Sequence, residues 1–277
     1  MGSVGYAFQE NYECMKLSVV TINFNNCIGL KKTIDSVVVQ TSRNFEWIII
    51  DGGSTDGSRE LIEQHQEHFI FWCSEPDKGI YNAMNKGIAR AQGEYLLFLN
   101  SGDYFANEQV IEKCLPYLKD YDFISGRTKT IHEDGSEVIG RHAPTLTAYH
   151  IVNYYLSHPS TFIRSKLLKK RGYREDLKIV SDWEQQLYEL VFHDATYTSI
   201  PLVISVFTED GISSKDKDCV KRERESVCKE YFSKRLMMSV IGDNEMKQIV
   251  NHIDENTSLY KILLFTIKLV RKLVIIR

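Results

Sequence analysis

Three aspartates stand where a folded chain could use them for chemistry: Asp51, Asp103 and Asp182. Asp51 closes the apolar run at positions 45–50, and Asp103 closes the segment YLLFLNSGD. Asp182 stands in the segment VSDWE, where a helix is expected to begin. Carboxylates accept N–H hydrogen bonds, bind hard divalent cations and take up protons. The chain therefore carries groups suited to binding a ligand and to acid–base chemistry.

The elements that must position these acids follow from the apolar pattern. We expect strands at 17–23, 45–51, 69–73 and 95–99, and helices at 29–40, 58–68 and 79–91. This alternation predicts an α/β fold with a mostly parallel sheet flanked by helices. Ligands bind outside the carboxyl ends of such strands. The polar groups at those ends should line one crevice: Asn23, Asn25, Asp51 and the run Asn100, Ser101, Gly102 and Asp103.

The pattern changes after about residue 120. Short strands are expected at 123–125, 129–131 and 137–140, with a hairpin turn at 133–136. A helix is expected at 180–192, followed by two strands, 196–200 and 202–207, on either side of Pro201. Beyond residue 215 the chain is helical in pattern and highly charged. Residues 1–16 are interpreted as an N-terminal extension with little structural role.

Composition limits the kinds of partner. The 277 residues carry a formal charge of −3, which gives no general attraction to nucleic acid. The six cysteines form no C-x-x-C pair, which favours a reducing compartment. Residues 1–16 lack an apolar signal segment, so we expect a cytoplasmic location.

Asp51 is followed by two glycines that let backbone approach a ligand closely. Its carboxylate could accept the N3–H of uracil or thymine, a proton that cytosine lacks. The alternative is that Asp51 caps the next helix, although Ser54, Thr55 and Asp56 are also suitable caps. Because position 54 is Ser, the string is not the G-x-G-x-x-G pattern of dinucleotide dehydrogenases.

Asp103 is a candidate ligand for magnesium or manganese, and such a cation would offset the charge on a diphosphate leaving group. The alternative is that Asn-Ser-Gly-Asp is an ordinary turn. Between the two aspartates, residues 75–87 open a helix whose N-terminus favours phosphate. On this helix Asp77, Asn82 and Asn85 are polar groups within reach of a nucleoside.

Asp182 and Glu184 are both candidates for the base that deprotonates an acceptor hydroxyl. The alternative is that both acids simply favour the first turn of a helix capped by Ser181. Trp183 could stack on a sugar or fill the core.

Several segments in order resemble family 2 glycosyltransferases with the GT-A fold, in particular bacterial enzymes of O-antigen, capsule and exopolysaccharide assembly. They are SVVTINFNN, IIIDGGSTDGS, DKGIYNAMNKG, GEYLLFLNSGD, HPSTF, SDWE and GISS, and they span roughly residues 17–215. The resemblance implies a donor half at about 17–126, an acceptor half at about 127–215 and a helical C-terminal region at 216–277.

The resemblance also implies roles for individual residues. The expected nucleotide-binding residues are Thr21, Asn23, Asn25, Asp51, Ser54, Asp77, Asn82, Asn85 and Ser101. Asp103 corresponds to the metal ligand of the D-x-D motif, although Ser101 and Gly102 offer no second carboxylate. We therefore expect a bound Mn²⁺ or Mg²⁺ to depend on the phosphates of the donor.

In the acceptor half, Asp182 occupies the place of the catalytic base, with Ser181 in place of the usual first acid of the motif. His158, Trp183 and Glu184 are expected near the donor and acceptor sugars. A lone histidine before proline is more often structural, and that alternative stays open for His158. The segment 208–214 resembles the flexible loop over the active site.

The expected function is inverting transfer of a hexose from a UDP-sugar, or a dTDP-sugar, to a lipid-linked saccharide in the synthesis of surface polysaccharide such as lipopolysaccharide. Residues 258–277 carry five cations and no acid, which is typical of an amphipathic helix on an anionic membrane surface. A peripheral position on the inner face of the membrane follows, with a core-packing or dimerising helix as the alternative. The competing functions are a nucleotide-sugar-binding scaffold without activity and a sugar nucleotidyltransferase.

Overall fold

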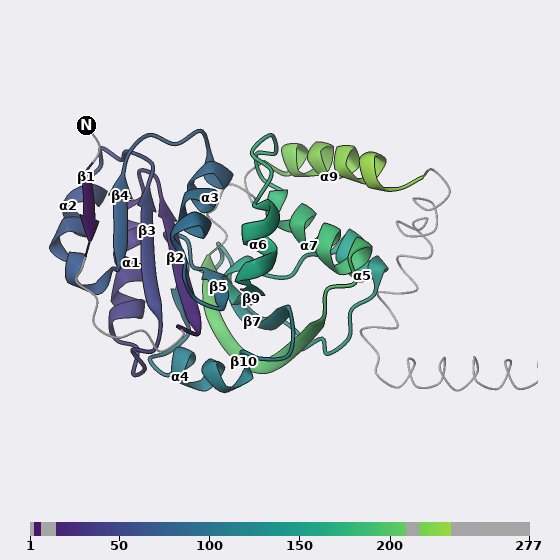
Figure 1. Ribbon diagram of the computed structural model, residues 1–277, viewed down its shortest axis with the longest axis horizontal. Coiled ribbons are helices and arrows are strands. Elements are labelled where there is room, and N and C mark those ends of the chain that lie inside the picture. Colours follow the sequence, from purple (N-terminus) through teal and green to yellow (C-terminus); the bar gives the residue numbers. More distant parts are fainter. Residues whose placement is uncertain (1–2, 7–14, 209–215, 234–277) are drawn as a thin grey trace, which may run out of the picture. The chain divides into compact units, whose positions relative to one another are not determined.

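The computed structural model describes residues 3–6, 15–208 and 216–233 (Figure 1). The chain divides into two compact units, Met1–Val227 and Cys228–Arg277. Of the second unit the structure describes only residues 228–233, most of which belong to the end of helix α9 (Lys217–Tyr231). The architecture below is that of the first unit.

One mixed sheet runs through this unit in the order β1-β4-β3-β2-β5-β9-β7-β10-β6, with β8 paired to β7. Strands β2, β3, β4 and β5 are parallel neighbours, which confirms the predicted parallel sheet. The strands are β1 (Ser3–Tyr6), β2 (Leu17–Asn23), β3 (Glu46–Asp51), β4 (Phe71–Ser74), β5 (Tyr95–Phe98), β6 (Tyr104–Phe105), β7 (Phe123–Ile131), β8 (Glu137–Ile139), β9 (Thr161–Arg164) and β10 (Tyr197–Thr208).

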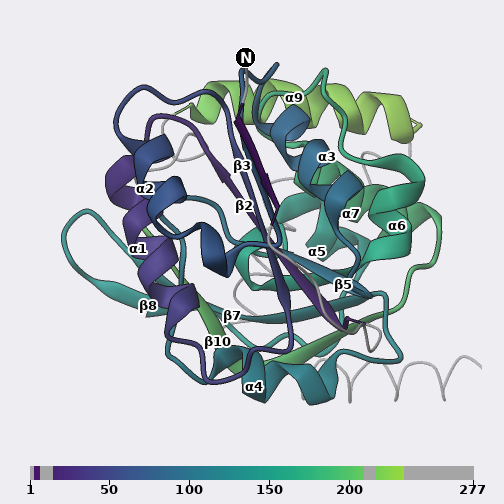
Figure 2. The ribbon, with the colours of Figure 1, turned by 60° about the vertical axis from the view of Figure 1, so that its left-hand side comes forward.

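Helices cover both faces of the sheet, α1 and α2 on one side and α3, α6 and α7 on the other (Figure 2). Each face has its own apolar core, and β2 contributes Val19 to one and Val20 to the other. Burial on both faces explains why the parallel strands are almost continuously apolar. The helices are α1 (Cys27–Val38), α2 (Ser58–Gln64), α3 (Ile80–Arg90), α4 (Val110–Cys114), α5 (Ala148–Asn153), α6 (Ser165–Arg171) and α7 (Ser181–Phe192), with short 3-10 turns η1 (Gln66–His68), η2 (Leu115–Tyr117) and η3 (His158–Ser160).

The structure corrects the prediction of two strands around Pro201. The segments form the single strand β10, which pairs in parallel with β7. Register shifts between Ser199 and Val203, and between Val203 and Ser205, leave Pro201 outside the ladder. Because proline lacks an N–H, a bulge lets the strand continue through it.

Two other expectations about the strands are revised. The pieces predicted at 123–125 and 129–131 are parts of one strand, β7, although the hairpin to β8 is confirmed. The extension at 1–16 was expected to have little structural role, yet Ser3–Tyr6 pairs antiparallel with Phe71–Ser74 as an edge strand. Isolated four-residue pairings carry too little pattern to be predicted from sequence.

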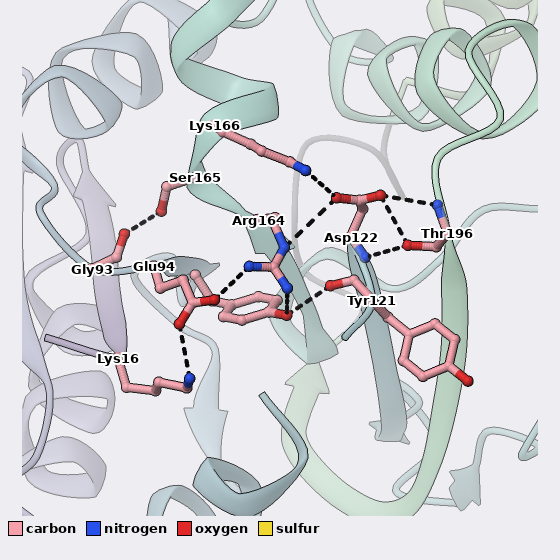
Figure 3. Close-up of polar contacts among 10 residues, drawn as sticks. Lys16, Gly93, Glu94, Tyr121, Asp122, Arg164, Ser165, Lys166 and Thr196 are labelled. Atoms are coloured by element: carbon pink, nitrogen blue, oxygen red, sulfur yellow. Dashed lines mark hydrogen bonds and ion pairs between the residues drawn. The ribbon is translucent and has the colours of Figure 1, made fainter. Parts of the chain in front are cut away.

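Strand β9 is antiparallel to both of its neighbours, β5 and β7, and joins the parallel strands to the later ones. At its end, Arg164 reaches Glu94 and Tyr95 on one side and Asp122 on the other (Figure 3). The Arg164 guanidinium also lies 4.7 Å from the centroid of the Tyr95 ring. This cluster, defined as the Arg164 network, ties the two halves of the sheet at the edge where β5 begins.

Candidate functional site

Polar groups meet at the carboxyl ends of β2, β3 and β5, as the alternation of elements predicted. Asn23 ends β2 directly opposite Asp51, which ends β3. On the other side of β2, the Ser101 N–H donates to the Ile22 carbonyl oxygen over 3.0 Å. The chain thus brings Asn23, Asp51 and Ser101 to one edge of the sheet.

The carboxylate of Asp51 is completely buried and is satisfied by the protein itself. Oδ1 accepts from Asn23 Nδ2 at 2.7 Å and from Ser54 Oγ at 2.6 Å. Oδ2 accepts from the Ser54 N–H at 2.9 Å and from Ser74 Oγ at 2.6 Å. The expectation that Asp51 contacts the base is therefore revised, because four internal donors leave this carboxylate no exposed surface. Asp51 joins Asn23, Ser54 and Ser74 at this edge of the sheet, and it does not cap α2, whose N-cap is Gly57.

The other residues expected to bind nucleotide near the end of β2 also form hydrogen bonds within the protein. Thr21 is fully buried and donates to the Leu99 carbonyl oxygen over 2.8 Å, so it is structural rather than a ligand contact. The Asn25 N–H donates to Ser54 Oγ at 2.8 Å, which ties this turn to the loop after β3. Asn23 keeps one buried acceptor, Oδ1, without a hydrogen-bond partner among the described residues.

Phe24 lies at the same strand end, although the sequence did not single it out as a candidate site residue. Its ring is 66% exposed although the residue directly follows a buried strand. A Cβ added at Gly52 would lie 3.1 Å from this ring and 3.1 Å from Asp77 Oδ2. The signal available in the sequence was an aromatic residue directly after a strand end, between Asn23 and Asn25. Phe24, Gly52 and Asp77 therefore lie next to one another, and the place that they share is defined as the recess.

Asp77 is held in place by Lys86, whose Nζ lies 2.5 Å from Asp77 Oδ1 and 2.8 Å from Glu75 Oε1. The Asp77 side chain is only 8% exposed. Burial raises the pKa of Asp77, although the ion pair with Lys86 opposes that rise. With Oδ1 occupied by lysine, Oδ2 faces the recess at Gly52.

Asn82 and Asn85, expected to bind the nucleotide, are hydrogen-bonded to the segment before α7. Asn82 Nδ2 and Asn85 Nδ2 each donate 2.9 Å hydrogen bonds to one of the two oxygens of Glu175. Asn85 also exchanges two hydrogen bonds with the backbone of Tyr173. Both amides therefore position the segment before α7.

The candidate metal position lies on the loop after β5. Asp103 is 9% exposed, and its backbone oxygen accepts from Thr33 Oγ1 at 2.7 Å. Three residues earlier, Asn100 Oδ1 is buried without a hydrogen-bond partner in the described part of the chain. A carboxylate and an amide oxygen are the hard donors that Mg²⁺ and Mn²⁺ prefer. The two residues fit such a cation, provided that other ligands come from a bound molecule.

That requirement agrees with the composition of the loop. Within residues 3–6, 15–208 and 216–233 no cluster of three or more His, Cys, Asp or Glu side chains could hold a metal. Ser101, the remaining side chain expected here, accepts a 3.3 Å hydrogen bond from Asn26 Nδ2. A weak site completed by diphosphate oxygens fits this arrangement.

Asp182 lies in the first turn of α7 and keeps part of its surface exposed, unlike its helical neighbours at 181 and 183–187. Tyr81 Oη, from the first turn of α3, donates to Asp182 Oδ1 over 2.8 Å. His158 is buried, stacks on Phe98 at 4.7 Å and lies 2.9 Å from Tyr173 Oη through Nε2. Burial lowers the pKa of His158, although the charge of Asp182 opposes this shift. A neutral imidazole therefore stands near a partly exposed carboxylate.

Trp183 and Glu184 do not reach a sugar site, contrary to expectation. Trp183 is 2% exposed and donates from Nε1 to the Ile151 carbonyl oxygen at 2.7 Å. Glu184 is fully buried and forms a two-pronged ion pair with Arg171. The predicted cap is also different, because Ser181 Oγ accepts from the Arg174 N–H while Val180 is the N-cap. These side chains fix α7 in place, so Asp182 is the acid of this turn that remains accessible.

Two expected features lie outside the described residues. The loop expected over the active site, at 208–214, is described only at Thr208. The basic tail at 258–277 is entirely outside. Within the described residues, no helix has the length and apolar character needed to cross a membrane.

The family model described as glycosyl transferase family 2 matches residues 18–178, more than half of the chain. An uncharacterized glycosyltransferase of Mycobacterium tuberculosis is 35% identical over 205 residues, covering 72% of this chain and 77% of that protein. The putative teichuronic acid biosynthesis glycosyltransferase TuaG of Bacillus subtilis is 34% identical over 107 residues, covering 37% of this chain and 41% of its own length.

Two solved structures share the fold. TarS of S. aureus, residues 1–349 in complex with UDP-GlcNAc, aligns with a TM-score of 0.58 at 18% identity, covering 84% of this chain and 78% of that one. The mannosyltransferase PcManGT of Pyrobaculum calidifontis, in complex with GDP-Man and Mn²⁺, aligns with a TM-score of 0.55 at 15% identity, covering 76% and 61%. At these identities the likeness concerns the GT-A fold, which agrees with the expected fold class.

Proposed function

The chain belongs to glycosyl transferase family 2 and is a glycosyltransferase, and on that premise we propose that it moves a hexose from a UDP-sugar, or a dTDP-sugar, to a lipid-linked saccharide with inversion. The observation that carries the proposal is the accessible Asp182 carboxylate beside α3, the helix that follows the recess at Phe24, Gly52 and Asp77. The competing functions of inactive scaffold and nucleotidyltransferase find no support in the similarities.

We propose that the recess binds a pyrimidine. The exposed Phe24 ring offers a face for stacking. Asp77 Oδ2, which points to the recess across Gly52, would accept the N3–H of uracil or thymine. Cytosine presents an acceptor at N3 and would meet the carboxylate as one acceptor facing another. Discrimination of this type depends on a buried polar group that the wrong ligand leaves unpaired.

Asp103 and Asn100 would hold Mn²⁺ or Mg²⁺ together with the donor phosphates. The cation, when bound, offsets the charge that the diphosphate gains as it leaves. Support for this assignment comes from Asn100 Oδ1, which has no hydrogen-bond partner among the described residues and belongs to the same loop as Asp103. It also agrees with the expectation that the cation binds poorly without the nucleotide.

The reaction itself needs a base, and Asp182 is proposed for that role. The carboxylate takes the proton of the acceptor hydroxyl while that oxygen forms a bond to the anomeric carbon of the donor. In the same step the bond from this carbon to the diphosphate breaks, and its electron pair leaves with the nucleoside diphosphate. One displacement from the opposite side inverts the anomeric centre, and the proton remains on Asp182.

The lipid-linked acceptor and the peripheral membrane position are proposed from the pattern of residues 258–277 and from the kind of enzyme that the chain resembles. Five cations without an acid would attract an anionic surface. Co-sedimentation of the full chain with vesicles containing anionic lipid, compared with a chain ending at residue 256, tests this part. Equal sedimentation of both would contradict it.

A binding experiment tests the donor site. Calorimetric titration of UDP, dTDP, CDP and GDP in the presence of Mn²⁺ should give tight binding of the first two nucleotides only. A titration of Mn²⁺ should show weak binding to the free protein and tighter binding when UDP is present. Equal affinity for CDP would refute the assignment of the recess, and tight Mn²⁺ binding without UDP would refute the proposed metal site.

A further inference from the structure

Tyr81 links α3 to the proposed base. Its hydroxyl lies 2.8 Å from Asp182 Oδ1 and 2.6 Å from the Ile179 carbonyl oxygen. The residue itself is 4% exposed. Burial raises the pKa of Tyr81 well above its ordinary value, and the neighbouring charge of Asp182 raises it further. The hydroxyl therefore keeps its proton throughout the neutral pH range.

A protonated tyrosine hydroxyl has one hydrogen and faces two acceptors. It can donate fully to Asp182 or to Ile179, but not to both at once. When Asp182 is ionised, donation to the carboxylate is favoured, because hydrogen bonds to charged groups are the stronger ones. When Asp182 is protonated, the hydroxyl can turn to the Ile179 oxygen and accept a hydrogen bond from the carboxylic acid. Both protonation states of Asp182 thus find a partner in the same side chain.

The segment that carries Asp182 is fixed to the same helix one turn later. Asn85 pairs with the N–H and the carbonyl oxygen of Tyr173 at 2.8 and 2.9 Å, as a neighbouring strand would. Asn82 and Asn85 share the carboxylate of Glu175. Gly172, at φ +73°, allows this approach, since a Cβ there would lie 2.9 Å from Asn85 Oδ1. The α3 clamp is defined here as Tyr81, Asn82 and Asn85.

We propose that the α3 clamp positions the catalytic base. Tyr81 orients the Asp182 carboxylate, donating a hydrogen bond to it when it is ionised and accepting one when it is protonated during transfer. The inference rests on the proposed role of Asp182. Helix α3 begins directly after the loop that carries Asp77 and contains Lys86, the partner of Asp77. Helix α3 therefore begins next to Asp77, the carboxylate proposed to recognise the nucleobase. Through Tyr81 the same helix contacts Asp182, the proposed catalytic base.

This arrangement separates a positioning role from a binding role. In the described part of the chain the Tyr81 hydroxyl is hydrogen-bonded to Asp182 and to the Ile179 carbonyl oxygen, so it should contribute little to the affinity for UDP. Loss of the hydroxyl would leave the carboxylate free to rotate away from the attacking oxygen. Misplacement of a catalytic group by about 1 Å can cost about 100-fold in rate.

The test compares Tyr81→Phe with Tyr197→Phe in the full chain. Tyr197 is a matched control, because its hydroxyl donates to the Ala143 carbonyl oxygen at 2.8 Å and has no contact with Asp182. UDP affinity is measured by calorimetry, and kcat and KM are measured as UDP release from a panel of UDP-hexoses. We expect Tyr81→Phe to lower kcat on the order of 10- to 100-fold, with Kd and KM within about twofold. Tyr197→Phe should retain kcat.

A stability cycle supplies a readout that does not require turnover. The unfolding equilibrium constant is measured in urea for the wild type, Tyr81→Phe, Asp182→Ala and the double variant. If the hydrogen bond is formed, Tyr81→Phe should raise the unfolding equilibrium constant in both backgrounds by different factors. The factor should be at least about five times larger in the presence of Asp182 than in the Asp182→Ala background. Equal costs in both backgrounds would overturn the inference.

The kinetic outcomes separate this inference from the function on which it rests. If Asp182→Asn abolishes turnover while Tyr81→Phe behaves like Tyr197→Phe, the clamp is wrong and the base assignment stands. If Asp182→Asn keeps normal turnover, the base assignment fails and the inference fails with it. If Tyr81→Phe loses UDP binding along with kcat, Tyr81 belongs to the donor site and the positioning role is refuted.

Discussion

Asn23 and Asp51 face each other across β2 and β3, and the amide of one donates to the carboxylate of the other over 2.7 Å. This pair is the centre of a buried network, and it explains why Asp51 is absent from the surface of the recess. The sequence predicted that Asp51 contacts a ligand, but in the structure its carboxylate accepts hydrogen bonds from the surrounding residues. The consequence can be measured.

Replacing Asp51 with alanine should lower stability. The substitution removes the buried acceptor that Asn23, Ser54 and Ser74 share, and each buried hydrogen bond lost in this way costs about 1–3 kcal/mol. We expect a decrease of about 3 kcal/mol in the free energy of unfolding, measured in urea. A variant as stable as the wild type that had lost only UDP affinity would restore Asp51 as a direct contact.

Replacing Asp77 with asparagine should change nucleotide selectivity and leave stability nearly constant. Lys86 retains its 2.8 Å ion pair with Glu75, so the loop keeps its anchor. The new amide can donate to N3 of cytosine, which the carboxylate cannot. Calorimetry should show weaker UDP binding and measurable CDP binding. Unchanged preference for UDP over CDP would contradict the assignment of Asp77 as the group that reads the base.

Replacing Phe24 with alanine should weaken UDP binding without destabilising the protein. The ring is 66% exposed, so its removal leaves no cavity in the core. Stacking of a base on an aromatic ring contributes about 1–3 kcal/mol, which corresponds to a loss of roughly 5- to 150-fold in affinity. Ile28→Ala is the matched control, because that side chain is 79% exposed four residues later. Equal UDP affinity of both variants would remove Phe24 from the site.

The Arg164 network should give the protein an acid-sensitive contribution to stability. Hydrogen bonding to Lys16 lowers the pKa of Glu94, with Arg164 acting in the same direction. A carboxyl group whose folded-state pKa is lowered stabilises the fold above its unfolded pKa and loses this effect as pH falls through the folded value. The unfolding free energy should therefore decline as pH drops below about 4.5, the ordinary value for glutamate.

The control for this prediction is Glu94→Gln, measured over the same pH range. The variant should be less stable than the wild type at pH 7, and the difference should shrink in acid. A constant difference from pH 7 to pH 3 would show that the ion pairs of Glu94 contribute nothing to the pH dependence. The side chain of Glu94 is 30% exposed, so screening by salt should reduce the effect.

The sequence predicted the parallel part of the fold well, for a physical reason. Strands such as Leu17–Asn23 are buried on both faces and separated by helices, and that pattern is visible residue by residue. The apolar pattern of the sequence was less informative about strands β9 and β10. Their pairing depends on distant partners and, in β10, on a bulge at Pro201 that absorbs a residue type which normally ends a strand.

The candidate site was predicted in outline and revised in detail. Strand ends indicated where polar side chains would gather, but not which of them keep surface for a ligand. Asp51, Trp183 and Glu184 are buried by tertiary partners that no local pattern encodes. Asn82 and Asn85 bind the Tyr173–Glu175 segment, about 90 residues away. Phe24 was overlooked because an aromatic residue beside a strand is ordinarily read as core.

The most direct test of the proposed function is the turnover of Asp182→Asn, measured together with the affinity of this variant for UDP. The amide keeps the size of the carboxylate and can still accept from Tyr81, so the fold and the donor site should be intact. We predict a loss of about 100- to 10,000-fold in UDP release from the donor, the usual contribution of a general base, with Kd for UDP within about twofold of the wild type. Near-normal turnover with UDP bound equally well would contradict the account.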